Sequence, residues 1–136
     1  GRLTRAEKEI IRKHVSIGGQ IFKRIIAKPW NDGLIRPSDA FLKIVSQCIT
    51  THHERPDSRG YPHKLRDDEI PDPGRILRVA DVFDALRERR PYKSELPAGQ
   101  VLEHILGNKK TGFDPLVARA LLEELDAQLS RLDGPR

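Results

Sequence analysis

Apolar residues at the start of the chain return every three or four positions, which is the spacing of an amphipathic helix. Thr4, followed three residues later by Glu7, forms a capping box, so this helix should run from about Thr4 to about Ala27. Its apolar stripe consists of Ile10, Ile11, Ile17, Ile21 and Ile25. His14 falls on that stripe, which predicts that its imidazole lies in the core.

A second helix should follow after a break. The segment 28–37 contains two prolines and an Asn-Asp-Gly turn, so it is predicted to be a loop. Ser38 can cap the next helix, whose apolar face leads to His52 and His53 at its C-terminal end. That face consists of Phe41, Val45, Cys48 and Ile49. Four prolines and two glycines within 55–74 then predict a long loop, of a kind that is usually functional or disordered.

Three further helices are predicted in the second half of the chain. One covers about 75–87 and is apolar nearly all round, so it should be buried. Another covers about 98–106 and stops at Gly107, while the last has Asp114 as its cap and Pro115 in its first turn. No segment has the period-two pattern of a strand. The predicted fold is therefore all-α, with about five helices.

The bulk composition narrows the class of protein. With 136 residues and 37% hydrophobic content, the chain suits a single domain, residues 1–136, with 28–37 as a loop insertion and 126–136 as a C-terminal tail. No apolar run reaches the roughly 18 residues of a membrane span, and the start has no secretory signal pattern, so we expect a soluble protein. The formal net charge of +5 favours an anionic partner. Aromatic residues make up only 5% of the chain and do not alternate with basic ones, which argues against a nucleic-acid binder. The lone cysteine, Cys48, is expected to be a buried, inert thiol.

Three histidines and one aspartate occupy positions whose apolar neighbours indicate the core: His14, His52, His53 and Asp81. A buried carboxylate without a partner destabilises a fold, so Asp81 and the nearby Asp84 need partners, and a metal ion is the strongest one available. Imidazole nitrogen and carboxylate oxygen suit iron, manganese, zinc or nickel. The alternative is that each histidine is a hydrogen-bonded core residue, and the pattern alone leaves both interpretations open.

The run HHERPDSRGYP, from His52 to Pro62, is similar to the defining stretch of the HD-GYP family, metal-dependent phosphodiesterases that open the bacterial second messenger cyclic di-GMP. Around it, LTRAEKEIIRKHVSIGGQIF resembles the family segment with an isolated metal-binding histidine. ILRVADVFDALRERRPYK resembles the segment with the last metal-binding aspartate and a basic substrate clamp. The resemblance extends from Leu3 to about Leu125, and it implies a helical bundle of the HD-domain type in a cytoplasmic bacterial protein.

Carried over by position, the resemblance assigns roles to individual residues. It implies that His14, His52, His53 and Asp81 bind two or three divalent metal ions, with iron or manganese ahead of zinc or nickel. Arg90 and Lys93 match the cations that hold the phosphate or guanine groups of cyclic di-GMP. The signature loop should shape the site, and it is a candidate contact for a GGDEF domain, which makes cyclic di-GMP, or for another protein partner. Its residues are Glu54, Asp57, Gly60, Tyr61 and Pro62.

Two departures from the family pattern keep other functions open. The His-Asp pair that names the family, with the lysine after it, should precede Leu3, so no catalytic residue is assigned within this chain. Ser58 stands where the signature has glycine, so a turn that needs a positive φ should be strained or rebuilt. Both departures favour a degenerate module that binds cyclic di-GMP or a partner protein without cleaving anything. A generic nucleotide phosphohydrolase of the HD superfamily is the third interpretation.

Overall fold

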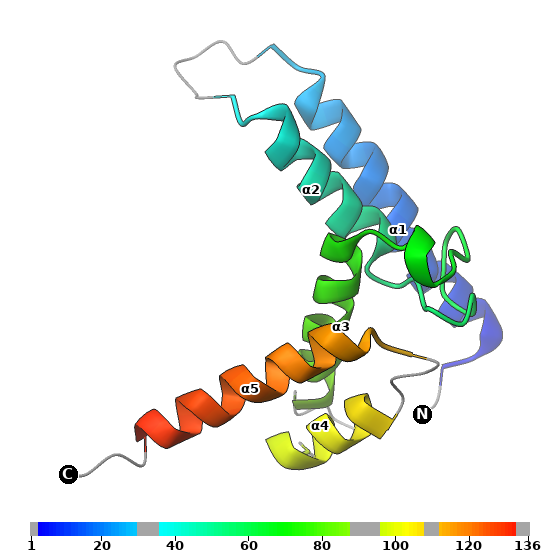
Figure 1. Ribbon diagram of the computed structural model, residues 1–136. Coiled ribbons are helices and arrows are strands. Elements are labelled where there is room, and N and C mark those ends of the chain that lie inside the picture. Colours follow the sequence, from blue (N-terminus) through cyan, green and yellow to red (C-terminus); the bar gives the residue numbers. More distant parts are fainter. Residues whose placement is uncertain (1–2, 30–35, 88–95, 108–111, 133–136) are drawn as a thin grey trace.

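A computed structural model describes residues 3–29, 36–87, 96–107 and 112–132 of the chain. Within them are five α-helices and a short 3-10 turn, and no strand (Figure 1). The helices are α1 (Arg5–Ile26), α2 (Asp39–Thr51), α3 (Asp72–Arg87), α4 (Ala98–Gly107) and α5 (Pro115–Leu132), and the 3-10 turn is η1 (Asp67–Glu69). The all-α prediction with about five helices is confirmed.

The predicted caps of the helices are present. At the start of α1 the Thr4 hydroxyl accepts a hydrogen bond from the Glu7 backbone N–H, and the Glu7 carboxylate accepts one from the Thr4 N–H at 2.7 Å. Ser38 caps α2 through the Phe41 N–H, and Asp114 caps α5 through the N–H groups of the first turn. Each cap satisfies backbone donors that a helix leaves unpaired. These helices therefore begin where local chemistry places them.

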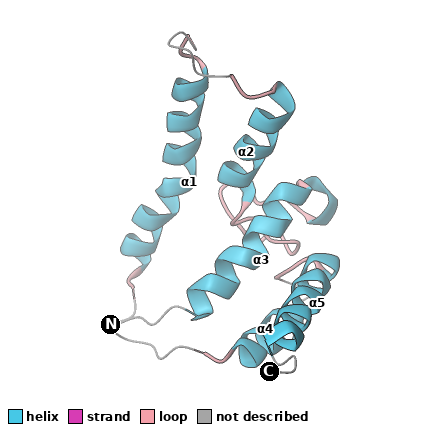
Figure 2. Cartoon of the chain, turned by 90° about the vertical axis from the view of Figure 1, so that its left-hand side faces the viewer, coloured by secondary structure: helices cyan, strands magenta, loops and turns pink. Residues whose placement is uncertain are grey.

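Helices α1 and α2 lie side by side and run in opposite directions (Figure 1, Figure 2). The two backbones approach closely at Gly18 and Gly19, because these residues have no side chain. A Cβ on either glycine would lie only 3.2 Å from a methyl group of α2. The buried side chains of this pair include Val15 and Leu42. The isoleucine stripe of α1 does not face α2: its five members are 48–66% exposed. The prediction that this stripe packs in the core is wrong.

Helix α3 joins this pair to the second half of the fold, because it packs on α2 at one end and on α4 and α5 at the other. The buried core lies around α3, α4 and α5 and comprises Val79, Val101, Ile105, Phe113 and Ala118. Burying an aliphatic side chain of this size contributes roughly 1.5–3 kcal/mol. Helix α3 is not buried on all sides as predicted, since Ile76 and Leu77 are exposed on its surface.

Helix α3 meets the end of α2 at a point where only a glycine fits. A Cβ on Gly74 would overlap the Thr51 side chain, which is itself buried. The half-buried Cys48 thiol lies nearby, with its Sγ 3.7 Å from the Pro73 carbonyl oxygen. Cys48 is thus less buried than predicted. This contact fixes the start of α3 beside the end of α2.

Candidate metal centre

The end of α2 places two consecutive histidines outside regular helix. The helix ends at Thr51, His52 is its C-cap, and His53 follows in a turn. The ring centres of His52 and His53 are 4.1 Å apart. The ring centre of His14, on α1, lies 5.5 Å from that of His52 and 5.0 Å from that of His53. One nitrogen from each of the three rings lies within 4.8 Å of the others. The structure thus brings together three histidines that the sequence separates by up to 39 positions.

Backbone carbonyls fix the tautomers of His14 and His52. His14 Nδ1 lies 2.7 Å from the Ile11 carbonyl oxygen, and His52 Nδ1 lies 2.9 Å from that of Cys48. A carbonyl oxygen only accepts, so both Nδ1 atoms must carry the hydrogen. In the neutral rings both Nε2 atoms are then lone-pair acceptors, and they face each other at 3.4 Å. Two facing lone pairs repel each other unless a metal ion or a proton lies between them.

This donor arrangement fits a metal ion. Histidine ligands ordinarily donate their second ring N–H to a backbone carbonyl or carboxylate, as both His14 and His52 do here. Two nitrogens that each lie about 2.1 Å from one tetrahedral ion are roughly 3.4 Å apart. The Nε2–Nε2 distance of 3.4 Å matches that value. His14, His52 and His53 are therefore a group that could hold a divalent ion.

His53 and Asp81 extend the group toward α3. The His53 Nδ1 atom lies 4.0 Å from Asp81 Oδ2. Burial, and next the proximity of His52, lower the pKa of His53 to about 4. At neutral pH His53 is thus the neutral imidazole that a metal requires. Asp81 thus lies beside His53 but outside the group formed by the three histidine nitrogens, and its side chain is 45% exposed.

The predicted burial of three candidate residues is wrong. His14, Asp81 and Asp84 are all exposed, while His52 and His53 are half-buried. His14 shares the exposed isoleucine face of α1, because α2 packs on the adjacent side, where Val15 and the two glycines lie. Water can therefore solvate the side chains of His14 and Asp81, and burial does not force a partner on either. The facing Nε2 atoms of His14 and His52 are the feature that favours a shared ion.

Glu54 holds the signature loop in place. Its side chain is completely buried, and its carboxylate accepts hydrogen bonds from the backbone N–H groups of His63 at 2.6 Å and Leu65 at 3.0 Å. Gly60 crosses directly over this point, and a Cβ there would overlap the backbone of Glu54 and Arg55. Glu54 thus organises the loop from within and contributes no oxygen to the histidine group.

Asp57 and Ser58 shape the outer turn of the loop. Arg55 donates two hydrogen bonds to the Asp57 carboxylate, at 2.8 and 2.6 Å, and this pairing lowers the pKa of Asp57 to about 2. Ser58 has a φ of 61°, in the left-handed region that favours glycine. Ser58 therefore adopts the left-handed conformation that a glycine would adopt without strain. The turn is strained rather than rebuilt, which is one of the two outcomes expected from the sequence. The Tyr61–Pro62 peptide bond is cis.

Tyr61 connects the signature loop to the histidines. Its ring stacks on that of His53, with 4.7 Å between the ring centres and an angle of 26° between the planes. The guanidinium group of Arg12, on α1, lies 5.1 Å from the centre of the Tyr61 ring. A row of three side chains thus runs from the histidine group to the surface of α1. Sequence reasoning missed Arg12, because a lone cation on a helix resembles an ordinary solvated residue.

A second missed residue is Arg78, one turn before Asp81 on α3. Its Nε donates to the Gly112 carbonyl at 2.7 Å, and its guanidinium lies 5.1 Å from the Phe113 ring centre. Burial, followed by the charge of Arg55, lowers the pKa of Arg78 to about 10, and its charge also helps to lower the pKa of His53. The two predicted clamp residues, Arg90 and Lys93, lie outside the described residues.

Comparison with known families identifies the domain. The model of the family described as HD domain matches residues 1–117. The chain belongs to the HD domain family. This HD domain is 36% identical over 93% of its length to a 3'3'-cGAMP-specific phosphodiesterase 2 of Vibrio cholerae. It is 37% identical over 90% of its length to a cyclic di-GMP phosphodiesterase of Thermotoga maritima, and 34% identical over 90% to one of Vibrio cholerae.

The matched region is a minor part of those relatives. The HD domain chain spans 22%, 30% and 23% of their respective lengths. Among the described helices, none has the length and apolar character needed to cross a membrane.

Proposed function

We propose that this HD domain belongs to a metal-dependent phosphodiesterase that hydrolyses cyclic di-GMP. The observation that carries the proposal is the pair of Nε2 atoms of His14 and His52, which face each other as acceptors at 3.4 Å. Their Nδ1 hydrogens are committed to backbone carbonyls, so neither neutral ring has a hydrogen left to donate to the other. The similarity to relatives named as cyclic dinucleotide phosphodiesterases supports this substrate class.

The metal ligands in this proposal are His14, His52, His53 and Asp81. When bound, divalent ions would neutralise charge that develops at phosphorus and activate a water molecule for attack. The mixed imidazole and carboxylate set suits iron, manganese, zinc or nickel, and the family resemblance puts iron or manganese first. His53 is kept in position by its stacking against Tyr61, and it remains unprotonated at neutral pH because burial lowers its pKa.

Other parts of the proposal rest on the family resemblance. Arg90 and Lys93 would hold the phosphate or guanine groups of the substrate, since a guanidinium fork and an ammonium both bind phosphate well. The signature loop around Tyr61 would face a partner such as a GGDEF domain. The relatives are bacterial proteins, so a bacterial cytoplasmic signalling role is part of the proposal.

Elemental analysis and product analysis of the full-length protein test this function. Asp81→Ala should lose metal, and its metal affinity should fall by more than the roughly 10–100-fold that changes behind the ligands cost. Asp84→Ala is the matched control, because Asp84 is an exposed aspartate one turn later on α3. Wild-type protein should open cyclic di-GMP to a linear dinucleotide, with 3'3'-cGAMP as the competing substrate.

Two outcomes would count against the proposal. Equal metal content in Asp81→Ala and Asp84→Ala would remove Asp81 from the ligand set. Tight binding of cyclic di-GMP by metal-loaded protein without any cleavage would support the second candidate, a non-catalytic binding module. The strained Ser58 in the signature loop is the observation that favours that candidate.

A further inference from the structure

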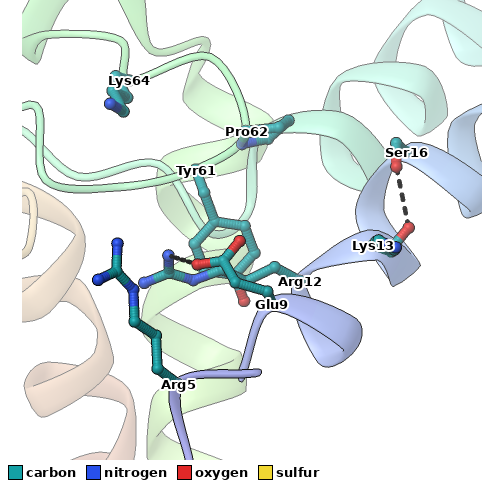
Figure 3. A pocket seen from close by; sticks show the side chains of 8 residues that line it. All are labelled: Arg5, Glu9, Arg12, Lys13, Ser16, Tyr61, Pro62 and Lys64. Carbon is teal, nitrogen blue, oxygen red and sulfur yellow. Dashed lines mark hydrogen bonds and ion pairs between the residues drawn. The ribbon is translucent and has the colours of Figure 1, made fainter. Parts of the chain in front are cut away.

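A basic pocket lies between the first half of α1 and the turn that carries Tyr61 and Pro62 (Figure 3). Its volume is about 500 Å³, within the range of sites that take small-molecule ligands. Four of its lining side chains are cations, namely Arg5, Arg12, Lys13 and Lys64, and one is the carboxylate of Glu9. Cations therefore outnumber the carboxylate among the described residues that line it.

Arg12 is the best placed of these cations. Its Nη1 lies 2.8 Å from Glu9 Oε1, and its guanidinium group lies over the Tyr61 ring. Both partners of this ion pair are about half exposed, at 47% and 58%, and pairs of this kind contribute little stability. A stronger anion could therefore displace Glu9 at little cost. The aromatic contact would meanwhile keep the planar guanidinium facing the pocket.

The pocket is separate from the histidine group but shares a wall with it. Tyr61 lines the pocket, and the same ring stacks on His53. Arg12 lies close to this ring as well. None of the four proposed metal ligands lines the pocket. A ligand in the pocket would thus be one aromatic ring away from the candidate metal centre.

We propose that this pocket binds a phosphate group, held by Arg12 with the other cations Arg5, Lys13 and Lys64 around it. A guanidinium fork matches two phosphate oxygens, and lysines add positive charge without fixed geometry. The proposal goes beyond the proposed function, because the pocket is complete without the histidines. The phosphate has two chemical sources: the uncleaved phosphate of a dinucleotide whose other phosphate is at the histidine group, or a separate phosphate-bearing molecule.

Titration calorimetry of the full-length protein with inorganic phosphate tests the pocket. The double variant Arg12→Gln with Lys13→Gln should bind phosphate at least about tenfold more weakly, because charge-assisted contacts of this kind are worth about that much. The matched control is Lys23→Gln with Arg24→Gln, an adjacent lysine and arginine at the other end of the same helix. The control should bind as wild type does.

Glu9→Gln separates binding from loss of structure. This variant removes the carboxylate that competes for Arg12, so phosphate affinity should rise severalfold, a gain that a damaged fold would not produce. Equal phosphate affinity in wild type, the Arg12 and Lys13 double variant and the control would overturn the proposal. So would an unchanged or reduced affinity in Glu9→Gln.

A second titration with cyclic di-GMP identifies the source of the phosphate. If one dinucleotide spans both sites, the double variant should bind cyclic di-GMP and inorganic phosphate more weakly than wild type, by a similar factor for each. If the phosphate belongs to a separate molecule, only phosphate binding should weaken. A wild-type protein that neither binds nor cleaves cyclic di-GMP would sink the proposed function, yet it would leave the phosphate titration as a valid test of the pocket.

Discussion

Replacing Glu54 with glutamine should destabilise the fold strongly, although the two side chains have nearly the same shape. The buried carboxylate accepts the backbone N–H groups of His63 and Leu65, at 2.6 and 3.0 Å. Glutamine keeps one acceptor oxygen and turns an NH2 group toward the other N–H. One charge-assisted bond worth about 1.5–3 kcal/mol is lost, and the other becomes a neutral bond worth about 1 kcal/mol less. We therefore expect the free energy of unfolding to fall by about 2.5–4 kcal/mol.

Urea denaturation followed by circular dichroism would measure this loss. Domains of this kind have total stabilities of about 5–15 kcal/mol, so the shift in midpoint should be large. Glu69→Gln is the control, because the Glu69 carboxylate accepts one backbone N–H in the same loop but is exposed. It should change the unfolding free energy by less than about 1 kcal/mol. A Glu54→Gln variant within 0.5 kcal/mol of wild type would refute the role of Glu54 as the anchor of the loop.

Two further predictions concern the outer turn of the loop. Ser58→Gly should raise the free energy of unfolding by about 0.5–1 kcal/mol in thermal denaturation, because the left-handed backbone at φ 61° penalises a side chain. Ser46→Gly, within α2, should instead lower it by about 1 kcal/mol, and a loss in both variants would contradict the reasoning. Asp57 has a folded-state pKa of about 2, below the ordinary value near 3.9, so its stabilisation is present above about pH 4 and is lost as the pH falls toward 2. Urea unfolding at pH 7, 4 and 2.5 should therefore show a smaller acid loss in Asp57→Asn than in wild type, and equal losses would count against the Arg55 pairing.

Helix positions were predictable because they depend on neighbours in sequence. The Thr4 and Glu7 capping box, and the caps Ser38 and Asp114, are present as predicted. Which face of a helix is covered was not predictable in the same way. The isoleucine spacing correctly identified one apolar side of α1, but α2 packs on the side with Gly18 and Gly19, where the backbones can come closest. Apolar spacing predicts an apolar face of a helix, but here α2 packs on the side that carries the small residues Gly18 and Gly19.

In the candidate site, too, features that depend on sequence neighbours were predictable and features that depend on tertiary packing were not. His52 and His53 were predicted together because they are adjacent at a helix end, and His14 was added by its place on the stripe and by the family resemblance. The prediction that His14 is buried is wrong, but His14 does lie close to His52 as expected. The contact of Arg12 with Tyr61 had no signal in the sequence, because it depends on the path of a loop 49 residues away. Contacts made by loop paths need the tertiary structure.

The placement of His14 has a consequence for how α1 is attached to the rest of the molecule. Among the described helices α1 packs on α2 alone, and its outer apolar side is open to water. An ion bound by both His14 and His52 would act as a cross-link between positions 38 residues apart. While the ion is bound, a detached α1 would have less conformational entropy, so the docked state would be favoured. Loading of the ion and docking of α1 are then one linked equilibrium. Hydrogen exchange of the α1 backbone amides should therefore slow when the ion binds, because the ion adds to the stability that packing on α2 already gives.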